Sequence, residues 1–199
     1  HAGSIVERPT SAETGPEGKS LWNTSLVFSA DGRLVTTYRK IHRFGFGAGE
    51  PVLMEAGERV VMVDLPDADP DDVGGSRSVR AGLSTCYDLR FPELFRLQVD
   101  RGAQILLMCS CWPLARVEHW RLLGRARALE NQCFLLACNT AGTHGGVTMG
   151  GRSQVVGPDG VVLAEGGLDE EVLSVEVDVG AVARYRATFP VLADRRPFT

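Results

Sequence analysis

The sequence predicts a layered α/β fold. Two short, continuous apolar runs at 105–109 and 134–138 are typical of strands covered on both faces, and a helical pattern at 117–131 separates them. A strand at 79–85 and a helix at 92–101 precede them. The middle of the chain therefore alternates strand, helix, strand, helix and strand, which indicates an α/β layer.

The segments before this middle part predict antiparallel strands. Residues 21–28 and 34–39 are rich in strand-forming residues and flank an Asp31-Gly32 turn, which favours a hairpin. The apolar run 60–65 is followed by an acidic stretch at 66–76 that contains proline and glycine. We interpret this stretch as a surface loop between two paired strands.

The segments after it predict a second hairpin and a helical tail. A glycine-rich loop covers 142–151, and the strands 154–157 and 161–164 flank a Pro-Asp-Gly turn. Residues 171–177 are predicted to form another strand, and the tail from Val179 a short helix with an exposed, arginine-rich end. With 199 residues, the chain is expected to be a single domain over 1–199.

Composition excludes several classes of function. The formal net charge of −4 leaves no basic stripe for nucleic acid, and no apolar run reaches the roughly 18 residues of a membrane span. The five cysteines are odd in number and lie mostly in apolar runs, which favours reduced thiols and a cytoplasmic location. A Cys-Ser-Cys pair at 109–111 lacks a second pair at ligand spacing, so neither metal nor cofactor is expected.

Cys86 is the candidate nucleophile. It follows the buried-type strand 79–85 and precedes the helix at 92–101, at the edge where open α/β sheets place reacting groups. Amide groups at the start of a helix favour the thiolate, the nucleophilic form of cysteine. A buried structural thiol is the alternative interpretation.

Three motifs in order resemble the nitrilase superfamily of carbon–nitrogen hydrolases. They are YRKIH at 38–42, CYDLRFPEL at 86–94, and HW at 119–120 followed by RARALENQ at 125–132. Because the motifs agree in order and spacing along nearly the whole chain, the resemblance is specific. It implies a four-layer αββα sandwich that needs no cofactor.

The resemblance also implies a set of site residues. Cys86 matches the family's nucleophile, Lys40 its catalytic lysine and Glu50 its supporting glutamate. A lysine ammonium would stabilise the oxyanion and the thiolate, and the backbone N–H of Tyr87 is a second oxyanion donor. The residues expected to line the acyl pocket are Ser110, Trp112 and Asn139.

The sequence departs from the family at its beginning. The family's general base is a glutamate near the N-terminus, and no residue here matches it, since Glu7 corresponds to a different glutamate. We expect about three strands and two helices, roughly 60 to 80 residues, to be missing. A polypeptide of these residues alone is expected to be unstable or inactive, because no base remains for Cys86.

The expected activity is hydrolysis of a small linear amide through a cysteine thioester, releasing ammonia and a carboxylic acid. The CYDLRFPEL motif resembles the amidase branch with omega-amidase and deaminated-glutathione amidase. An N-carbamoyl amide hydrolase, a non-catalytic scaffold of the same fold and a redox or metal-thiol protein stay open as alternatives. The resemblance further implies a homodimer or higher homo-oligomer, assembled through the helix after Cys86 and the helix at 117–131.

Overall fold

A computed structural model of the chain describes residues 2–10, 13–66 and 78–196. The strands are β1 (Ala2–Glu7), β2 (Trp22–Phe28), β3 (Leu34–Arg39), β4 (Met62–Pro66), β5 (Ser78–Thr85), β6 (Ile105–Ser110), β7 (Phe134–Asn139), β8 (Thr143–His144), β9 (Val147–Thr148), β10 (Gln154–Val156) and β11 (Val162–Glu165). The helices are α1 (Glu50–Leu53), α2 (Pro92–Asp100), α3 (Val117–Asn131) and α4 (Gly180–Thr188), with single 3₁₀ turns at Cys86–Arg90, Leu114–Arg116 and Val191–Asp194. The predicted hairpins, the central strands and the three long helices are confirmed.

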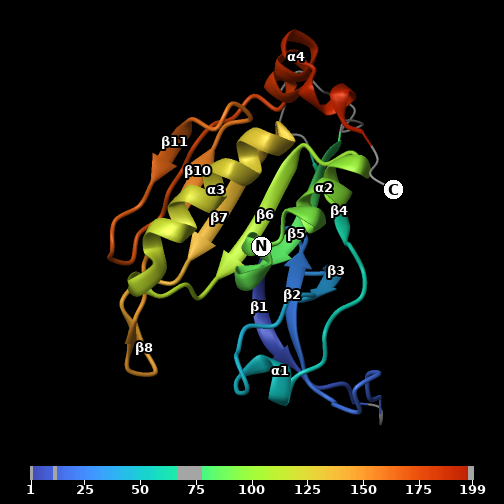
Figure 1. Ribbon diagram of the computed structural model, residues 1–199, viewed down its shortest axis with the longest axis vertical. Coiled ribbons are helices and arrows are strands. Elements are labelled where there is room, and N and C mark those ends of the chain that lie inside the picture. The colour runs from blue at the N-terminus through green and yellow to red at the C-terminus, as the bar shows by residue number, and fades with distance from the viewer. Residues whose placement is uncertain (1, 11–12, 67–77, 197–199) are drawn as a thin grey trace.

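A six-stranded sheet in the order β11-β10-β7-β6-β5-β4 forms the centre of the molecule (Figure 1). Strands β5, β6 and β7 are parallel and are connected by α2 and α3, as the alternating sequence pattern predicts. Strand β4 adds to β5 antiparallel, and the β10–β11 hairpin adds to β7 antiparallel. The carboxyl ends of the three parallel strands therefore meet at one edge, where the candidate site lies.

The helices α2 and α3 cover one face of this sheet (Figure 1). Leu106 of β6 and Leu135 of β7 are completely buried beneath Phe95 of α2 and Trp120 of α3. Burial of side chains of this size stabilises a fold by about 2 to 3 kcal/mol each. These apolar contacts fix the strands whose ends carry the site.

A three-stranded antiparallel sheet in the order β1-β2-β3 packs on the other face, against β5. Its buried Tyr38 and Val27 join Leu83 of β5 in a second apolar cluster. A hydrogen bond of 2.7 Å between the hydroxyls of Ser25 and Thr85 ties the two sheets together. The described residues thus form helix, sheet and sheet layers, which confirms the α/β class.

One predicted strand and one predicted loop differ from the structure. Residues 171–177 alternate like a strand, but they form none, and Val172 is 93% exposed. A strand needs a backbone partner as well as an alternating pattern, and among the described residues no strand pairs with this segment. The glycine-rich loop at 142–151 contains the small β8–β9 hairpin. The predicted surface loop at 66–76 lies, beyond Pro66, outside the described residues.

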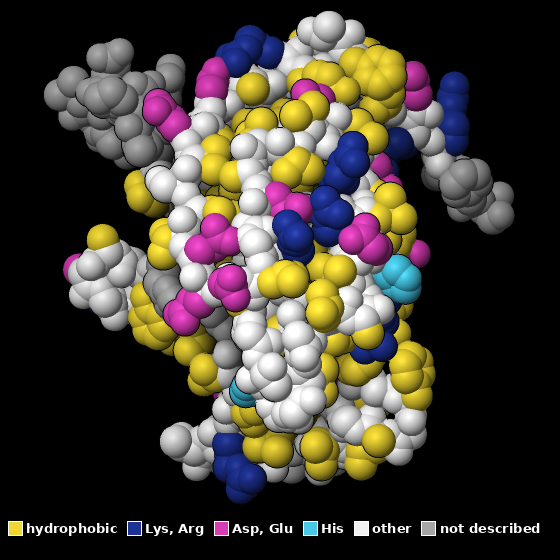
Figure 2. All heavy atoms as spheres, turned by 90° about the vertical axis from the view of Figure 1, so that its left-hand side faces the viewer, with side chains coloured by type: hydrophobic (Ala, Val, Ile, Leu, Met, Phe, Trp, Pro, Cys, Tyr) yellow, Lys and Arg dark blue, Asp and Glu magenta, His cyan; other side chains and the backbone are white. Residues whose placement is uncertain are grey.

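The face that carries β11 mixes charges of both signs (Figure 2). Glu165 of β11 pairs with Arg121 of α3 at 2.8 Å and with Arg152 at 3.5 Å. Interspersed pairs of this kind give no extended field of one sign. In the described part of the chain, no helix has both the length and the apolar character needed to cross a membrane.

Candidate active site

Cys86 lies directly after β5, at the first position of a 3₁₀ turn that leads into α2. Its backbone has φ 49°, in the left-handed region that non-glycine residues rarely adopt. The thiol is half-buried, and its Sγ lies 3.9 Å from the carbonyl oxygen of Cys111 at the end of β6. The turn thus presents the thiol at the carboxyl edge of the parallel strands.

The carboxylate of Asp88 joins the Cys86 turn to the end of β3. Asp88 is completely buried and accepts hydrogen bonds from the Tyr38 hydroxyl at 2.7 Å and the backbone N–H of His42 at 3.0 Å. His42 Nδ1 donates a further bond at 2.8 Å, and the backbone N–H of Thr85 donates one at 2.9 Å. The motifs around Lys40 and Cys86 therefore lie side by side.

Lys40 pairs with Glu50 in the structure. The Lys40 ammonium is 2% exposed and lies 2.5 Å from Glu50 Oε2. Burial by itself raises the pKa of Glu50, but the Lys40 charge and the hydrogen bonds from Lys40, from the backbone N–H of Phe44 and from Asn23 outweigh it, so the pKa is lowered. Glu50 is therefore a charged partner that holds Lys40 in place.

A short glycine-containing loop positions Glu50. The backbone N–H of Glu50 donates to the Phe44 carbonyl at 3.1 Å, and the backbone N–H of Phe44 donates to Glu50 Oε2 at 2.6 Å. Gly45 has φ 151° and approaches the backbone of Ala48 too closely for any Cβ, so the loop requires glycine there. Asn23 Nδ2 binds Glu50 Oε1 at 2.7 Å, a positioning contact that the sequence pattern did not identify.

A small cavity of about 30 Å³ opens beside Cys86. Three aromatic rings surround it, those of Tyr87, Trp112 and Phe44. Two arginines complete the wall: Arg90 lies 4.8 Å from the Trp112 ring centroid and Arg116 lies 5.5 Å from that of Phe44. Within the described residues neither arginine pairs with a carboxylate; Arg90 instead donates to His119 Nδ1 at 3.1 Å.

The predicted pocket residues occupy two kinds of position. Tyr87 and Trp112 line the cavity beside Cys86, whereas Ser110 and Asn139 are register partners behind it, at the ends of β6 and β7. Asn139 uses its whole amide on backbone groups: Oδ1 accepts from Trp112 N–H at 2.6 Å, and Nδ2 donates to the carbonyls of Trp112 and Gly151 at 3.1 and 2.7 Å. Asn139 thus fixes the segment that carries Trp112. The buried Ser110 hydroxyl has no protein partner among the described residues.

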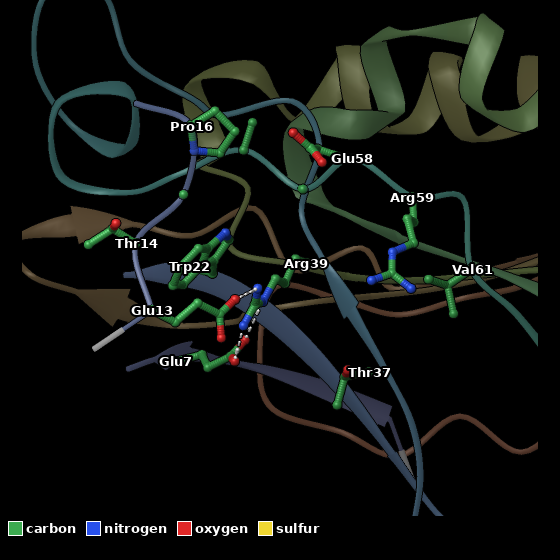
Figure 3. A pocket seen from close by; sticks show the side chains of 13 residues that line it. Glu7, Glu13, Thr14, Pro16, Trp22, Thr37, Arg39, Glu58, Arg59 and Val61 are labelled. Carbon is green, nitrogen blue, oxygen red and sulfur yellow. Dashed lines mark hydrogen bonds and ion pairs between the residues drawn. The ribbon is translucent and has the colours of Figure 1, made fainter. Parts of the chain in front are cut away.

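A larger polar pocket of about 550 Å³ lies elsewhere, over β1 to β3 (Figure 3). There Arg39 stacks on the Trp22 ring at 3.9 Å and pairs with Glu7 at 2.6 Å and Glu13 at 2.7 Å. The hydrogen bonds that Arg39 donates to Glu7 and Glu13 raise the pKa of Arg39, and the bond from Arg39 is the main cause of the lowered pKa of Glu7. This pocket contains none of the predicted site residues. Its charged side chains connect the strands β1, β2 and β3.

The other cysteines differ in burial. Cys133 is completely buried, and burial raises the pKa of its thiol to about 11. Cys138 is exposed rather than part of the core, because it belongs to the face of β7 opposite α3. In the parts of the chain that the structure describes, no three His, Cys, Asp or Glu side chains converge as metal ligands would.

The sequence model of the carbon-nitrogen hydrolase family matches residues 2–187, and the chain belongs to this family. It is 44% identical to a 2-oxoglutaramate amidase of Paenarthrobacter nicotinovorans over 98% of this chain and 63% of that protein, and 35% identical to one of Bacillus subtilis over 98% of this chain and 68% of that protein. Its structure is similar to a CN-hydrolase superfamily protein of Xanthomonas campestris that carries an arsenic adduct in its active site, with a TM-score of 0.81, 32% identity, and coverage of 100% of this chain and 69% of that one. The chain thus spans about two thirds of the length of these relatives, and the predicted family resemblance is confirmed.

Proposed function

We propose that the protein hydrolyses the terminal amide of a small carboxylate-bearing molecule, with Cys86 as nucleophile. The main support is the cavity at Cys86, because two arginines line it. Neither arginine has a carboxylate partner among the described residues. The relatives named 2-oxoglutaramate amidase support it as well, because that substrate carries both an amide and a carboxylate.

In the proposed mechanism the Cys86 thiol gives up its proton as the sulfur attacks the amide carbon, and the departing nitrogen takes up that proton and leaves as ammonia when the thioester forms. Water then cleaves the thioester, which releases the carboxylic acid and regenerates the thiol. The Lys40 ammonium and the backbone N–H of Tyr87 stabilise the oxyanion, and Glu50 orients Lys40 through their 2.5 Å contact. No residue of this chain is assigned to the general base.

The walls of the cavity supply the proposed selectivity. Arg90 and Arg116 would bind the substrate carboxylate, since a guanidinium forms charge-assisted hydrogen bonds with it. Trp112 and Tyr87 would border the short chain between carboxylate and amide at the mouth of the cavity, whose volume of about 30 Å³ is close to that of one water molecule. Asn139 would act indirectly, by holding the Trp112 backbone.

We further propose a single domain over 1–199 that acts in the cytoplasm as a homodimer or higher homo-oligomer. The free cysteines support a reducing compartment. Exposed leucines on the two outer helices support assembly through these helices. Leu97 of α2 is 48% exposed, and Leu122 and Leu129 of α3 are 68% and 48% exposed.

The first experiment measures ammonia release by the purified full-length protein from dicarboxylic acid monoamides, neutral amides of equal length and N-carbamoyl acids. We expect turnover of the monoamides and a loss of about 10³-fold or more in Cys86→Ala. Cys138→Ala, which removes an exposed thiol outside the cavity, serves as the matched control. Equal activity of Cys86→Ala and the unchanged protein would refute the mechanism, and carbon dioxide release would favour the carbamoyl alternative.

A second variant tests the carboxylate site. Arg116→Met keeps an unbranched side chain and removes its charge, so we expect kcat/KM for the monoamide to fall about 10- to 100-fold. The neutral amide should lose little. If both substrates lose equally, Arg116 does not recognise a carboxylate.

A further inference from the structure

We propose that Asp88 is a positioning residue that sets the reactivity of Cys86 by holding the Lys40 segment against the turn of the nucleophile. This inference rests on the proposed function, because Lys40 and Cys86 have catalytic roles only in that mechanism. It adds a residue that touches neither the substrate nor the reacting thiol.

The hydrogen bonds of Asp88 are divided between the two segments. Three donors come from the end of β3 and the residues after it: the Tyr38 hydroxyl and the N–H and Nδ1 of His42. The remaining donor is the backbone N–H of Thr85, the residue before Cys86. One carboxylate therefore links segments that are 46 to 50 positions apart in the sequence.

Lys40 lies between the two residues that Asp88 holds. Tyr38 and His42 flank it in the sequence, and its backbone N–H donates to the Asn23 carbonyl at 2.8 Å. The position of the Lys40 ammonium relative to Cys86 therefore depends on where the 38–42 segment lies. The His42 ring also stacks on Phe91 at 3.8 Å with an interplanar angle of 5°, so the segment contacts both Asp88 within the turn and the residue that follows the turn.

The chemistry of the site calls for a carboxylate. An ionised carboxylate only accepts hydrogen bonds and offers about four lone-pair sites, which matches the donors around Asp88. An asparagine would place an NH₂ group against donors, which leaves hydrogen bonds unmade in a completely buried site. A glutamate would be one methylene too long for a core this closely packed.

The backbone of Cys86 makes this support necessary. A non-glycine residue at φ 49° is sterically costly and persists only when its surroundings hold it there. The Asp88 bond to Thr85 N–H fixes the start of the turn at 2.9 Å. Loss of this bond would release the thiol from its orientation as well as moving Lys40.

The test compares Asp88→Asn, Tyr38→Phe and the surface control Asp64→Asn in the purified full-length protein. For each, we would measure kcat and KM for a monoamide, the rate of Cys86 alkylation by iodoacetamide from peptide masses, and the thermal midpoint. Asp64 pairs with Arg80 on the exposed side of β4, so its change to asparagine controls for the loss of one carboxylate. All rates are divided by the concentration of folded protein.

We expect kcat to fall about 100-fold in Asp88→Asn, because small displacements of reacting groups cost about that much, while KM changes little. Alkylation of Cys86 should slow in parallel. Tyr38→Phe removes one of the donors and should lower kcat by roughly fivefold. Asp64→Asn should behave like the unchanged protein.

Two results would overturn the inference. The first is an Asp88→Asn protein whose folded fraction keeps the original kcat and alkylation rate, even if its thermal midpoint is lower, because Asp88 would then be structural only. If Asp88→Asn does not fold, the second is a Tyr38→Phe protein with unchanged kcat and alkylation rate. Failure of the proposed function is recognised separately, by activity that survives in Cys86→Ala.

Discussion

At the scale of single residues, the Lys40–Glu50 pair is the contact with the clearest dependence on pH. The folded state lowers the pKa of Glu50 below its ordinary value of 4.5. A group with a lowered pKa contributes stability that is complete above the unfolded pKa and is lost as the pH falls through the folded value. Acid should therefore weaken this pair.

Glu50→Gln tests this dependence. At pH 7 the variant should be less stable by about 1 to 3 kcal/mol, because the buried Lys40 ammonium loses its charged partner. The difference should shrink as the pH falls below about 4.5, because the unfolded chain then binds the proton first, and it should be lost once the pH lies below the lowered pKa of the native carboxylate. Urea unfolding at pH 7 and in acid measures both values, with the surface change Glu118→Gln as control. A difference independent of pH would contradict the interpretation.

The sequence indicated the proposed reactive residues more readily than the residues that support them. Lys40, Glu50 and Cys86 were selected because they stand in or beside motifs that resemble those of the carbon–nitrogen hydrolases. The hydrogen bonds that Asp88 accepts from Tyr38 and His42 were not foreseen from the sequence. Such bonds depend on how distant segments meet, which a one-dimensional pattern does not contain.

At the scale of elements, α3 depends on a close approach to β10 at Gly124. A Cβ at this position would lie 2.2 Å from Gln154 Nε2 and 3.1 Å from a methyl group of Leu135, both buried. We expect Gly124→Ala to lower the free energy of unfolding by about 1 to 3 kcal/mol through overpacking, despite the better helix propensity of alanine.

Gly180→Ala in α4 is the matched control. Its nearest atoms are the ends of the flexible Arg184 and Asp178 side chains, so the helix propensity of alanine should dominate and leave stability unchanged or higher. Urea unfolding of both variants gives the comparison. Equal effects at the two positions would show that α3 does not need the close contact.

The elements were predictable to different degrees for a physical reason. The pattern at 117–131 gave the bounds of α3, because a buried helical face repeats over several turns. The alternating pattern at 171–177 correctly indicates a segment with one more exposed side. Whether such a segment pairs as a strand depends on a neighbouring strand elsewhere in the fold, which its own residues do not specify. Local periodicity is therefore a better guide to helices than to edge strands.

At the scale of the whole molecule, stability should be highest where both faces of the central sheet are packed. Leu106 and Leu135 lie completely buried at the centre of β6 and β7, whereas the residues of the β8–β9 hairpin are exposed. Amide hydrogen exchange should be slower in β6 and β7 than in β8–β9 by roughly 10³-fold or more. Mass spectrometry of proteolytic fragments measures these rates. Comparable protection in the hairpin would mean that the described core is not the most stable part.

The left-handed backbone of Cys86 has a consequence for how this protein can evolve. Glycine adopts φ 49° without steric cost, but it carries no thiol. At this position the side chain that the backbone favours and the side chain that the proposed reaction uses are therefore different. Relatives released from selection for turnover should drift toward glycine or asparagine here, so that retention of cysteine marks lineages in which the reaction is still maintained.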